Sequence, residues 1–148
     1  MQSKNYFIIK YLKSPFYNYF VINFYDKSKL VFFFIWKKIN IKKYNSQIIR
    51  VVDFCGQIPK DKYIKNVIEK YLIDEKIAYL DVLSFWIKDD ILSKIGFLKK
   101  SAKQKIPNYF EPFIDQDTDL NCAILNNTYK KKLLLVKGDG DQDRPNKI

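Results

Sequence analysis

The chain contains no histidine, and this absence removes whole classes of chemistry. Nucleophilic sites of the Ser-His-Asp and Cys-His types need an imidazole, and so do most catalytic zinc sites. The two cysteines, Cys55 and Cys122, have neither metal-ligand spacing nor the density of a secreted disulfide scaffold. Each lies in an apolar segment, so we expect buried thiols. A general base must therefore come from Asp, Glu, Tyr, Lys or Cys.

Glycine and proline are also scarce, at 4 and 5 of 148 residues, whereas 47% of the residues are hydrophobic and 17% aromatic. This composition is globular and differs from that of disordered chains. The length predicts a single domain, residues 1–148. The longest apolar run, residues 30–36, is too short for a membrane span of about 20 residues. The lysine-bearing N-terminus has no small-residue cleavage site, so we expect a cytoplasmic protein.

Acidic residues are few beside the basic ones, 16 against 27, which gives a net charge of +11. Only two of the cations are arginines, although specific recognition of phosphates and bases favours the arginine fork. The lysines are spread along the chain and form no single block. These features argue against nucleic acid as a partner and leave weak attraction to anionic ligands or membranes.

Apolar segments predict three antiparallel strands, at residues 16–25, 30–39 and 47–54. A helix follows over residues 61–76, because its apolar residues fall on one stripe at helical spacing: Ile64, Val67, Ile68, Tyr71 and Leu72. A fourth strand is expected at residues 77–87. A strand, a helix and a strand in this order predict that the third and fourth strands are parallel neighbours, diverging toward their ends.

A second, short helix should open at Asp89 and Asp90 and end at Gly96. The proline- and aromatic-rich residues 97–119 predict an ordered loop, and residues 120–125 and 129–138 predict a last hairpin. The expected fold class is therefore α/β, with a mixed sheet of about six strands and two helices.

This order of elements resembles the GNAT acetyltransferase fold from its second strand onward. The stretch "LSKIGF" at residues 92–97 is similar to that superfamily's Leu-Tyr-x-x-x-Gly-Phe helix end. Together, "IIRVVDFCG", "AYLDV", "IPNYFEPF" and "KGDGDQDRPN" resemble a narrower GNAT-like group associated with bacterial surface-polysaccharide gene clusters. The resemblance covers the chain from about Tyr11. It implies that the first strand and first helices of the fold are missing.

The resemblance implies an acyltransferase-like protein of surface-polysaccharide or sugar-nucleotide metabolism, with N- or O-acyl transfer either retained or degenerate. Its implied cofactor is a coenzyme A thioester. GNAT enzymes hold the pyrophosphate with Gln/Arg-x-x-Gly-x-Gly/Ala, but the matching "CGQIPKDK" keeps only Gly56, and Pro59 has no N–H. The family's leaving-group tyrosine corresponds to Leu92. We therefore expect weak or no binding of acetyl-coenzyme A by this chain alone.

An alternative is a non-catalytic module that binds a sugar nucleotide or completes a partner chain. A tunnel for pantetheine between the third and fourth strands would distinguish the enzyme from this module. The first strand would also form a sheet edge rich in Phe and Tyr. Such an edge invites pairing, so we expect a homodimer or a partner chain that supplies the missing N-terminal half.

Two buried carboxylates are candidate site residues. Asp53 lies near the C-terminal end of its strand, where open α/β sheets place ligands, and catalysis and structural pairing are equally expected there. For Asp81 we favour structural pairing. Arg50 lies three residues before Asp53 and should point to the opposite face, which argues against a direct pair.

Near the C-terminus, Asp139, Asp141 and Asp143 alternate as in a calcium loop, but Arg144 stands where an EF-hand needs glycine. A solvated tail and a weaker cation site stay open. The resemblance implies a third interpretation, a segment facing a ligand at the centre of the sheet. Asp141 or Asp143 would then accept a hydroxyl proton, while Asp139 and Arg144 would bind the ligand.

Aromatic residues surround one further carboxylate. Tyr109, Phe110 and Phe113 flank Glu111. Such a group can stack on a sugar or nucleotide sugar and hydrogen-bond it, or it can cover the open side of a small core. The candidate ligand-binding residues are thus Gly56, Tyr109, Glu111, Asp139 and Arg144, beside the candidate catalytic residues Asp53, Asp141 and Asp143.

Overall fold

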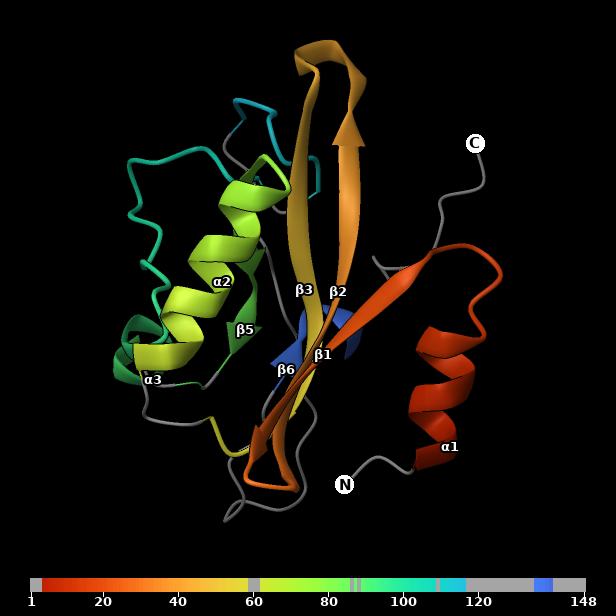
Figure 1. Ribbon diagram of the computed structural model, residues 1–148. Coiled ribbons are helices and arrows are strands. Elements are labelled where there is room, and N and C mark those ends of the chain that lie inside the picture. The colour runs from red at the N-terminus through yellow and green to blue at the C-terminus, as the bar shows by residue number, and fades with distance from the viewer. Residues whose placement is uncertain are drawn as a thin grey trace, which may run out of the picture.

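A computed structural model describes residues 4–58, 62–85, 87, 89–108, 110–116 and 135–139 (Figure 1). The fold is α/β, with a four-stranded mixed sheet in the order β1-β2-β3-β4 and a two-stranded sheet of β5 and β6. Helix α2 lies against one face of the larger sheet and α1 lies on the other side (Figure 1). The predicted fold class is confirmed at this level.

The three antiparallel strands form as predicted. They are β1 (Tyr19–Asp26), β2 (Lys29–Ile41) and β3 (Ser46–Gly56), each hydrogen-bonded to the next. The first turn has Lys27 at φ 55°, and the second closes through a 3-10 turn, Lys42–Tyr44, that ends at Asn45 with φ 45°. Both turns use a left-handed residue to reverse the chain.

The parallel crossover is also confirmed. Helix α2 (Lys62–Asp74) leads into β4 (Ile77–Val82), which pairs with β3 in parallel. Its apolar stripe buries Ile64 and Ile68 in a cluster with Phe34, Val51 and Phe54. Ring contacts extend this cluster across the sheet, since the ring of Phe34 on β2 lies 6.0 Å from that of Phe24 on β1 and 6.1 Å from that of Phe54 on β3.

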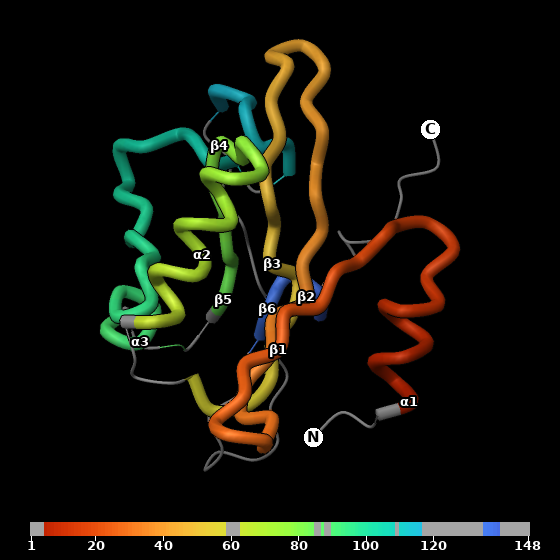
Figure 2. The backbone as a smooth tube through the Cα atoms, in the orientation of Figure 1, coloured from red at the N-terminus to blue at the C-terminus, as the bar shows by residue number. Residues whose placement is uncertain are grey.

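The strand predicted at residues 77–87 is wrong in one respect, because it is two strands. Pairing between β3 and β4 ends at Val51 and Val82, and β5 (Ser84–Phe85) pairs with β6 (Leu135–Val136) instead. Strand β3 continues to Gly56, where it stays paired with β2 but no longer with β4. Beyond the fork, β6 and the 3-10 turn η3 (Lys137–Asp139) lie beside β3 (Figure 2). Residues 135–139 lie at this point beside β3, and their strand β6 pairs with β5, the continuation of β4. Strands β3 and β4 therefore diverge there, as the sequence predicted.

The short helix α3 (Asp89–Lys94) ends as predicted at Gly96, which has φ +99°. The Gly96 N–H donates to Ser93 O at 3.1 Å and the Phe97 N–H to Leu92 O at 3.1 Å. These two bonds form a Schellman motif, whose left-handed position favours glycine.

The counts of helices and strands differ from the prediction. Helix α1 (Lys4–Phe7), continued by a π-helical segment (Ile8–Leu12), precedes β1. This adds a third α-helix to the two predicted. The predicted six strands are not confirmed as a set, because residues 120–125 lie outside the described residues and only Leu135–Val136 of residues 129–138 is assigned as a strand. Within the described ranges, every helix is too short or too polar to cross a bilayer.

Candidate functional site

The carboxylate of Asp53 is the centre of a buried polar cluster at the end of β3. Asp53 is 5% exposed. Its Oδ2 accepts a hydrogen bond from the Tyr11 hydroxyl at 2.7 Å, and its Oδ1 accepts one from the Phe54 N–H at 2.8 Å. A buried carboxylate needs such donors, and these two satisfy one oxygen each.

The local backbone explains how Asp53 reaches this position. In the β2–β3 ladder Trp36 pairs with Val51 and Ile35 pairs with Asp53, so Val52 is an extra residue in β3. This bulge interrupts the alternation of side chains just before Asp53. Val52 and Ile35 pack with Tyr11, whose ring is 2% exposed. Burial of that aromatic residue therefore places its hydroxyl at Asp53.

The C-terminal segment reaches the same place. The Lys10 Nζ donates to the Tyr6 hydroxyl at 2.6 Å and to the carbonyl oxygen of Gly138. A Cβ on Gly138 would lie 2.7 Å from Val52 O and closer still to the Tyr11 hydroxyl, so only glycine fits. The Asp139 Oδ2 accepts a hydrogen bond from the Val136 N–H at 3.0 Å. Lys137 and Gly138 are therefore buried, whereas Asp139 is exposed and is held through its carboxylate.

This environment shifts two pKa values. Burial raises the pKa of Asp53 and the charge of Asp139 adds to the effect, while hydrogen bonds from Tyr11 and Phe54 oppose it. Burial and the neighbouring Asp53 raise the pKa of Tyr11, so its hydroxyl stays a neutral donor. A carboxyl with a raised pKa can exchange protons nearer to neutral pH, as acid–base catalysis requires.

Asp81 has the structural role favoured from the sequence. Arg50, 4% exposed, binds it with both Nε and Nη2, at 2.9 Å to Oδ1 and 2.7 Å to Oδ2. The same Nη2 donates to the carbonyl oxygen of Asn108 at 2.8 Å. The Tyr79 hydroxyl donates to Pro112 O at 2.9 Å. Residue 108 and residues 110–116 are thus held to the sheet through Arg50 and Tyr79.

Contacts of Phe113 and Tyr79 show how the aromatic residues near Glu111 lie against the sheet. Phe113 packs against the rings of Tyr44 and Tyr79, with centroids 5.4 and 5.5 Å apart, so it covers the sheet. Burial and Asp81 raise the pKa of Tyr79 to about 12, against the opposing charge of Arg50. Glu111 is exposed. Its role in binding a sugar stays a prediction, and Tyr109 lies outside the described residues.

Gly56 has a structural explanation beside the predicted one. It ends β3 at φ +104°, and a Cβ there would lie 2.9 Å from the Phe32 Cα and closer to Val31 O. The hairpin backbone therefore demands glycine at this position. Residues 59–61 of the predicted phosphate loop are outside the described part of the chain, as are Asp141, Asp143 and Arg144.

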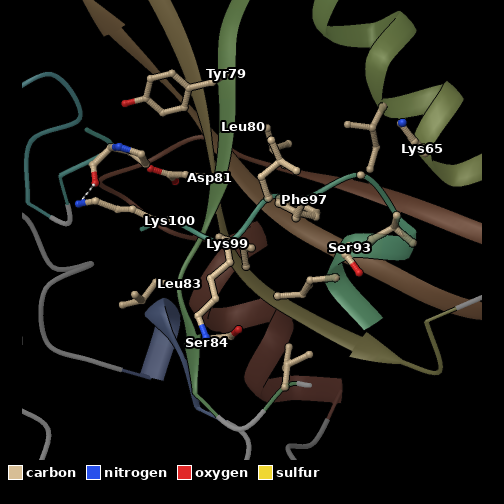
Figure 3. A pocket seen from close by; sticks show the side chains of 18 of the residues that line it. Lys65, Tyr79, Leu80, Asp81, Leu83, Ser84, Ser93, Phe97, Lys99 and Lys100 are labelled. Carbon is tan, nitrogen blue, oxygen red and sulfur yellow. Dashed lines mark hydrogen bonds between the residues drawn. The ribbon is translucent and has the colours of Figure 1, made fainter. Parts of the chain in front are cut away.

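A cavity of about 1190 Å³ lies between α2, β4, α3 and residues 97–107 (Figure 3). Its wall is mainly aliphatic and aromatic, with Leu80 and Phe97 prominent in Figure 3, and its polar groups include serines, three lysines and three carboxylates. Of its described walls, none comes from β3, so it is not the predicted tunnel between the third and fourth strands. Sequence reasoning missed this cavity, because residues 97–107 carry no periodic pattern.

The cavity and the Asp53 cluster lie at the two ends of one short segment. Ser84, in the cavity wall, pairs with Val136 of β6. Two residues later, Gly138 contacts Tyr11 and Val52. Residues 135–139 therefore connect the cavity to Asp53 across the fork between β3 and β4.

When the chain is compared with models of known protein families and with curated proteins, nothing matches. The function must therefore be argued from the fork, the cavity and the Asp53 cluster.

Proposed function

We propose that this chain is an acyltransferase-like protein that holds the acyl group of a thioester in the cavity beside β4. The observation that carries the proposal is the cavity itself, about 1190 Å³ in volume, at the point where β4 leaves β3. The context of surface-polysaccharide or sugar-nucleotide metabolism, with a sugar amine or hydroxyl as acceptor, comes from the sequence resemblance alone.

The chemistry of the wall favours an acyl chain over a sugar. Five apolar side chains line the cavity: Leu72, Leu80, Val82, Leu92 and Phe97. Burying a methylene group contributes about 0.8 kcal/mol, whereas a sugar needs a convergent set of polar partners. Three lysines of the wall offer contacts to the anionic carrier of a thioester: Lys65, Lys99 and Lys100. The same wall contains three carboxylates, Glu69, Asp81 and Asp90, so its net charge does not itself attract the carrier.

One observation favours a second candidate, a non-catalytic binding module. Asp53 is 5% exposed, and Tyr11 and the Phe54 backbone already donate to its two oxygens. Acyl transfer would require the acceptor's hydroxyl or amine to replace Tyr11 at Asp53, which could then accept the proton. A module would need no such exchange.

Affinity for a series of coenzyme A thioesters tests acyl binding. Calorimetric titration with acetyl, butyryl and octanoyl thioesters should show weak binding of the acetyl form. Affinity should then rise roughly four-fold for each methylene that is buried, at about 0.8 kcal/mol each. Affinities that do not depend on chain length would contradict the proposal.

A pair of matched variants locates the binding. Ala78 lies in the cavity wall and is exposed, so Ala78→Trp should fill the entrance and weaken octanoyl binding at least ~10-fold. Ala102 is also exposed but is not part of the wall, so Ala102→Trp should bind like the wild type. Thermal unfolding of both variants shows that they fold.

Release of free thiol separates the two candidates. If the chain is an enzyme, adding hexosamine acceptors should release coenzyme A, and Asp53→Asn should slow the release without changing thioester affinity. A wild-type chain that binds thioesters and releases no thiol with any acceptor is the module.

A further inference from the structure

Strand β1 is the outer strand of the larger sheet, and no described strand pairs with its outer edge. Several of its apolar side chains are exposed: Phe20 by 44%, Val21 by 39% and Tyr25 by 59%. An edge strand offers a row of backbone N–H and C=O groups to any second strand that approaches it.

Over most of its length this edge lacks the usual protection against pairing, since the charged residue of β1 is the last one, Asp26. Residues 19–25 contain no charged residue and no proline, in a chain of net charge +11. The one irregularity of the β1–β2 ladder falls on β2, where Val31 has no partner between Leu30 and Phe32. The outer edge of β1 is therefore regular, although sheet proteins commonly block such edges with lysine, proline or a bulge.

The sequence of the strand is nearly the same in both directions. Residues 19–25 read Tyr-Phe-Val-Ile-Asn-Phe-Tyr, with Ile22 at the centre. An antiparallel pair of two such strands centred on Ile22 sets Tyr19 opposite Tyr25 of the partner subunit. It also sets Phe20 opposite Phe24 of the partner subunit. Aromatic residues directly opposite each other stabilise a pair of strands.

We propose that the chain forms a two-fold symmetric dimer in which β1 pairs antiparallel with β1 of a second copy, centred on Ile22. The two four-stranded sheets then become one continuous sheet. The exposed ring of Phe20 gains the ring of Phe24 of the partner subunit, so the aromatic cluster under α2 continues across the dimer axis. A two-fold interface closes on itself and leaves no free β1 edge.

A second copy fits this edge better than an unrelated strand for two reasons. The nearly symmetric sequence of residues 19–25 gives matched residue pairs only when β1 pairs with β1 of a second copy. The absence of charge over residues 19–25 also matters most for self-association, because two copies of a strongly cationic chain otherwise repel each other.

Sedimentation equilibrium of the full chain tests the dimer. The wild type should be dimeric at tens of micromolar. Val21→Lys/Asn23→Lys sets two pairs of like charges directly opposite each other and should weaken the dimer at least ~10-fold. The matched control, Asn66→Lys/Ile73→Lys, adds two lysines at exposed positions of α2 and should stay dimeric. A wild type that is monomeric at 100 micromolar, or that pairs through β1 only when a second polypeptide is added, overturns the proposal.

A variant of opposite charge controls for misfolding of Val21→Lys/Asn23→Lys. Mixing it with Val21→Glu/Asn23→Glu should restore a dimer that contains one chain of each kind. Failure of the mixture to associate, with both variants folded by circular dichroism, overturns the proposal.

Cross-linking tests the register in a Cys55→Ser/Cys122→Ser background. Residues 21 and 23 of the two copies lie opposite each other, at a Cα separation of about 4.5–5.5 Å that suits a disulfide. Two copies of residue 21 lie roughly 8 Å apart, beyond that range. A mixture of Val21→Cys and Asn23→Cys should therefore cross-link on oxidation, and neither alone should. Equal cross-linking of Val21→Cys alone, or none in the mixture, overturns the register.

Discussion

At the scale of single residues, the sequence predicts that Asp53 has a partner but does not identify that partner. Its position near the end of a buried strand predicts a partnered carboxylate. Its partner Tyr11 is 42 positions away in the sequence, and Gly138 packs against Tyr11 from the other end of the chain. No local pattern selects these partners, because the packing of the N-terminal helical segment on the sheet decides which hydroxyl reaches the carboxylate.

The raised pKa of Asp53 predicts a pH dependence of stability. A carboxyl with a higher pKa in the folded than in the unfolded state binds more protons when folded, across the interval above its ordinary value of 3.8. The free energy of unfolding should therefore fall as pH rises through that interval. Asp53→Asn cannot titrate, so its free energy of unfolding should fall less between about pH 4 and pH 7. Urea denaturation at several pH values measures the difference.

Asp74→Asn is the control for this pH series. Asp74 lies on the exposed side of α2 beside Lys70. Exposed pairs of this kind contribute little, so this variant should follow the wild-type pH dependence closely. If Asp53→Asn follows it too, Asp53 does not titrate differently in the folded state.

At the scale of elements, periodicity was sufficient wherever one segment packs on one face. The stripe from Ile64 to Leu72 predicts α2, and the glycine at position 96 predicts the end of α3. The parallel pairing of β3 and β4 follows from the strand-helix-strand order. These elements are set by neighbours in sequence, which is why the sequence could predict them.

Two elements could not be predicted from periodicity. The helical segment over residues 4–12 is short, and of residues 5–12 only Tyr11 is buried. Strand β4 ends at Val82 although residues 82–87 remain largely apolar. Its end is decided by β6, which comes from more than fifty positions later in the chain and pairs with β5. Long-range pairing of this kind leaves no local signature.

The Arg50–Asp81 pair predicts the stability of the 108–116 loop. Asp81→Ala leaves the buried guanidinium of Arg50 without its carboxylate, which should cost about 3–5 kcal/mol. Hydrogen exchange of residues 108–116 should accelerate, because Arg50 also holds the Asn108 carbonyl. Denaturant unfolding and exchange measured by mass spectrometry check both effects.

Two further variants identify the cause. Arg50→Met/Asp81→Leu removes both charges and should recover much of the lost stability, although the loop stays loose. Asp74→Ala breaks an exposed pair and should cost roughly 0–1 kcal/mol. If Asp81→Ala costs no more than Asp74→Ala, the Arg50–Asp81 pair does not hold the loop.

At the scale of the whole molecule, residues 135–139 join parts that are distant in sequence. They pair with β5, approach β3 and contact the N-terminal segment through Lys10 and Tyr11. The sequence indicated that the aspartate-rich tail could be packed and could donate or accept hydrogen bonds. Of this tail, Asp139 lies within the described residues and is exposed, although its carboxylate accepts a hydrogen bond from the Val136 N–H. Packing of the tail stays a prediction, because Asp141, Asp143 and Arg144 lie outside the described residues.

Truncation tests this joining role. A chain ending after Lys137 loses the Gly138 carbonyl that accepts from Lys10 and the Asp139 carboxylate that accepts from the Val136 N–H. Each hydrogen bond contributes roughly 0.5–1.5 kcal/mol, so this chain should be about 1–3 kcal/mol less stable than one ending after Asp139. Equal denaturant midpoints of the two truncated chains would show that residues 138 and 139 do not hold the molecule together.

The sequence by itself determined the class of the fold, the three antiparallel strands, α2 and the parallel return of β4. Apolar repeats within single segments predict the strands and the helix, and the strand-helix-strand order predicts the parallel return. The sequence also excluded histidine chemistry outright. Only the tertiary structure decided where β3 and β4 diverge and where the cavity lies. It also decided that Asp53 accepts a hydrogen bond from Tyr11 and that Asp81 pairs with Arg50. These features arise where segments far apart in sequence meet. These features are stabilised by the free energy gained when polar and apolar groups of different segments are buried together. No single segment encodes that free energy.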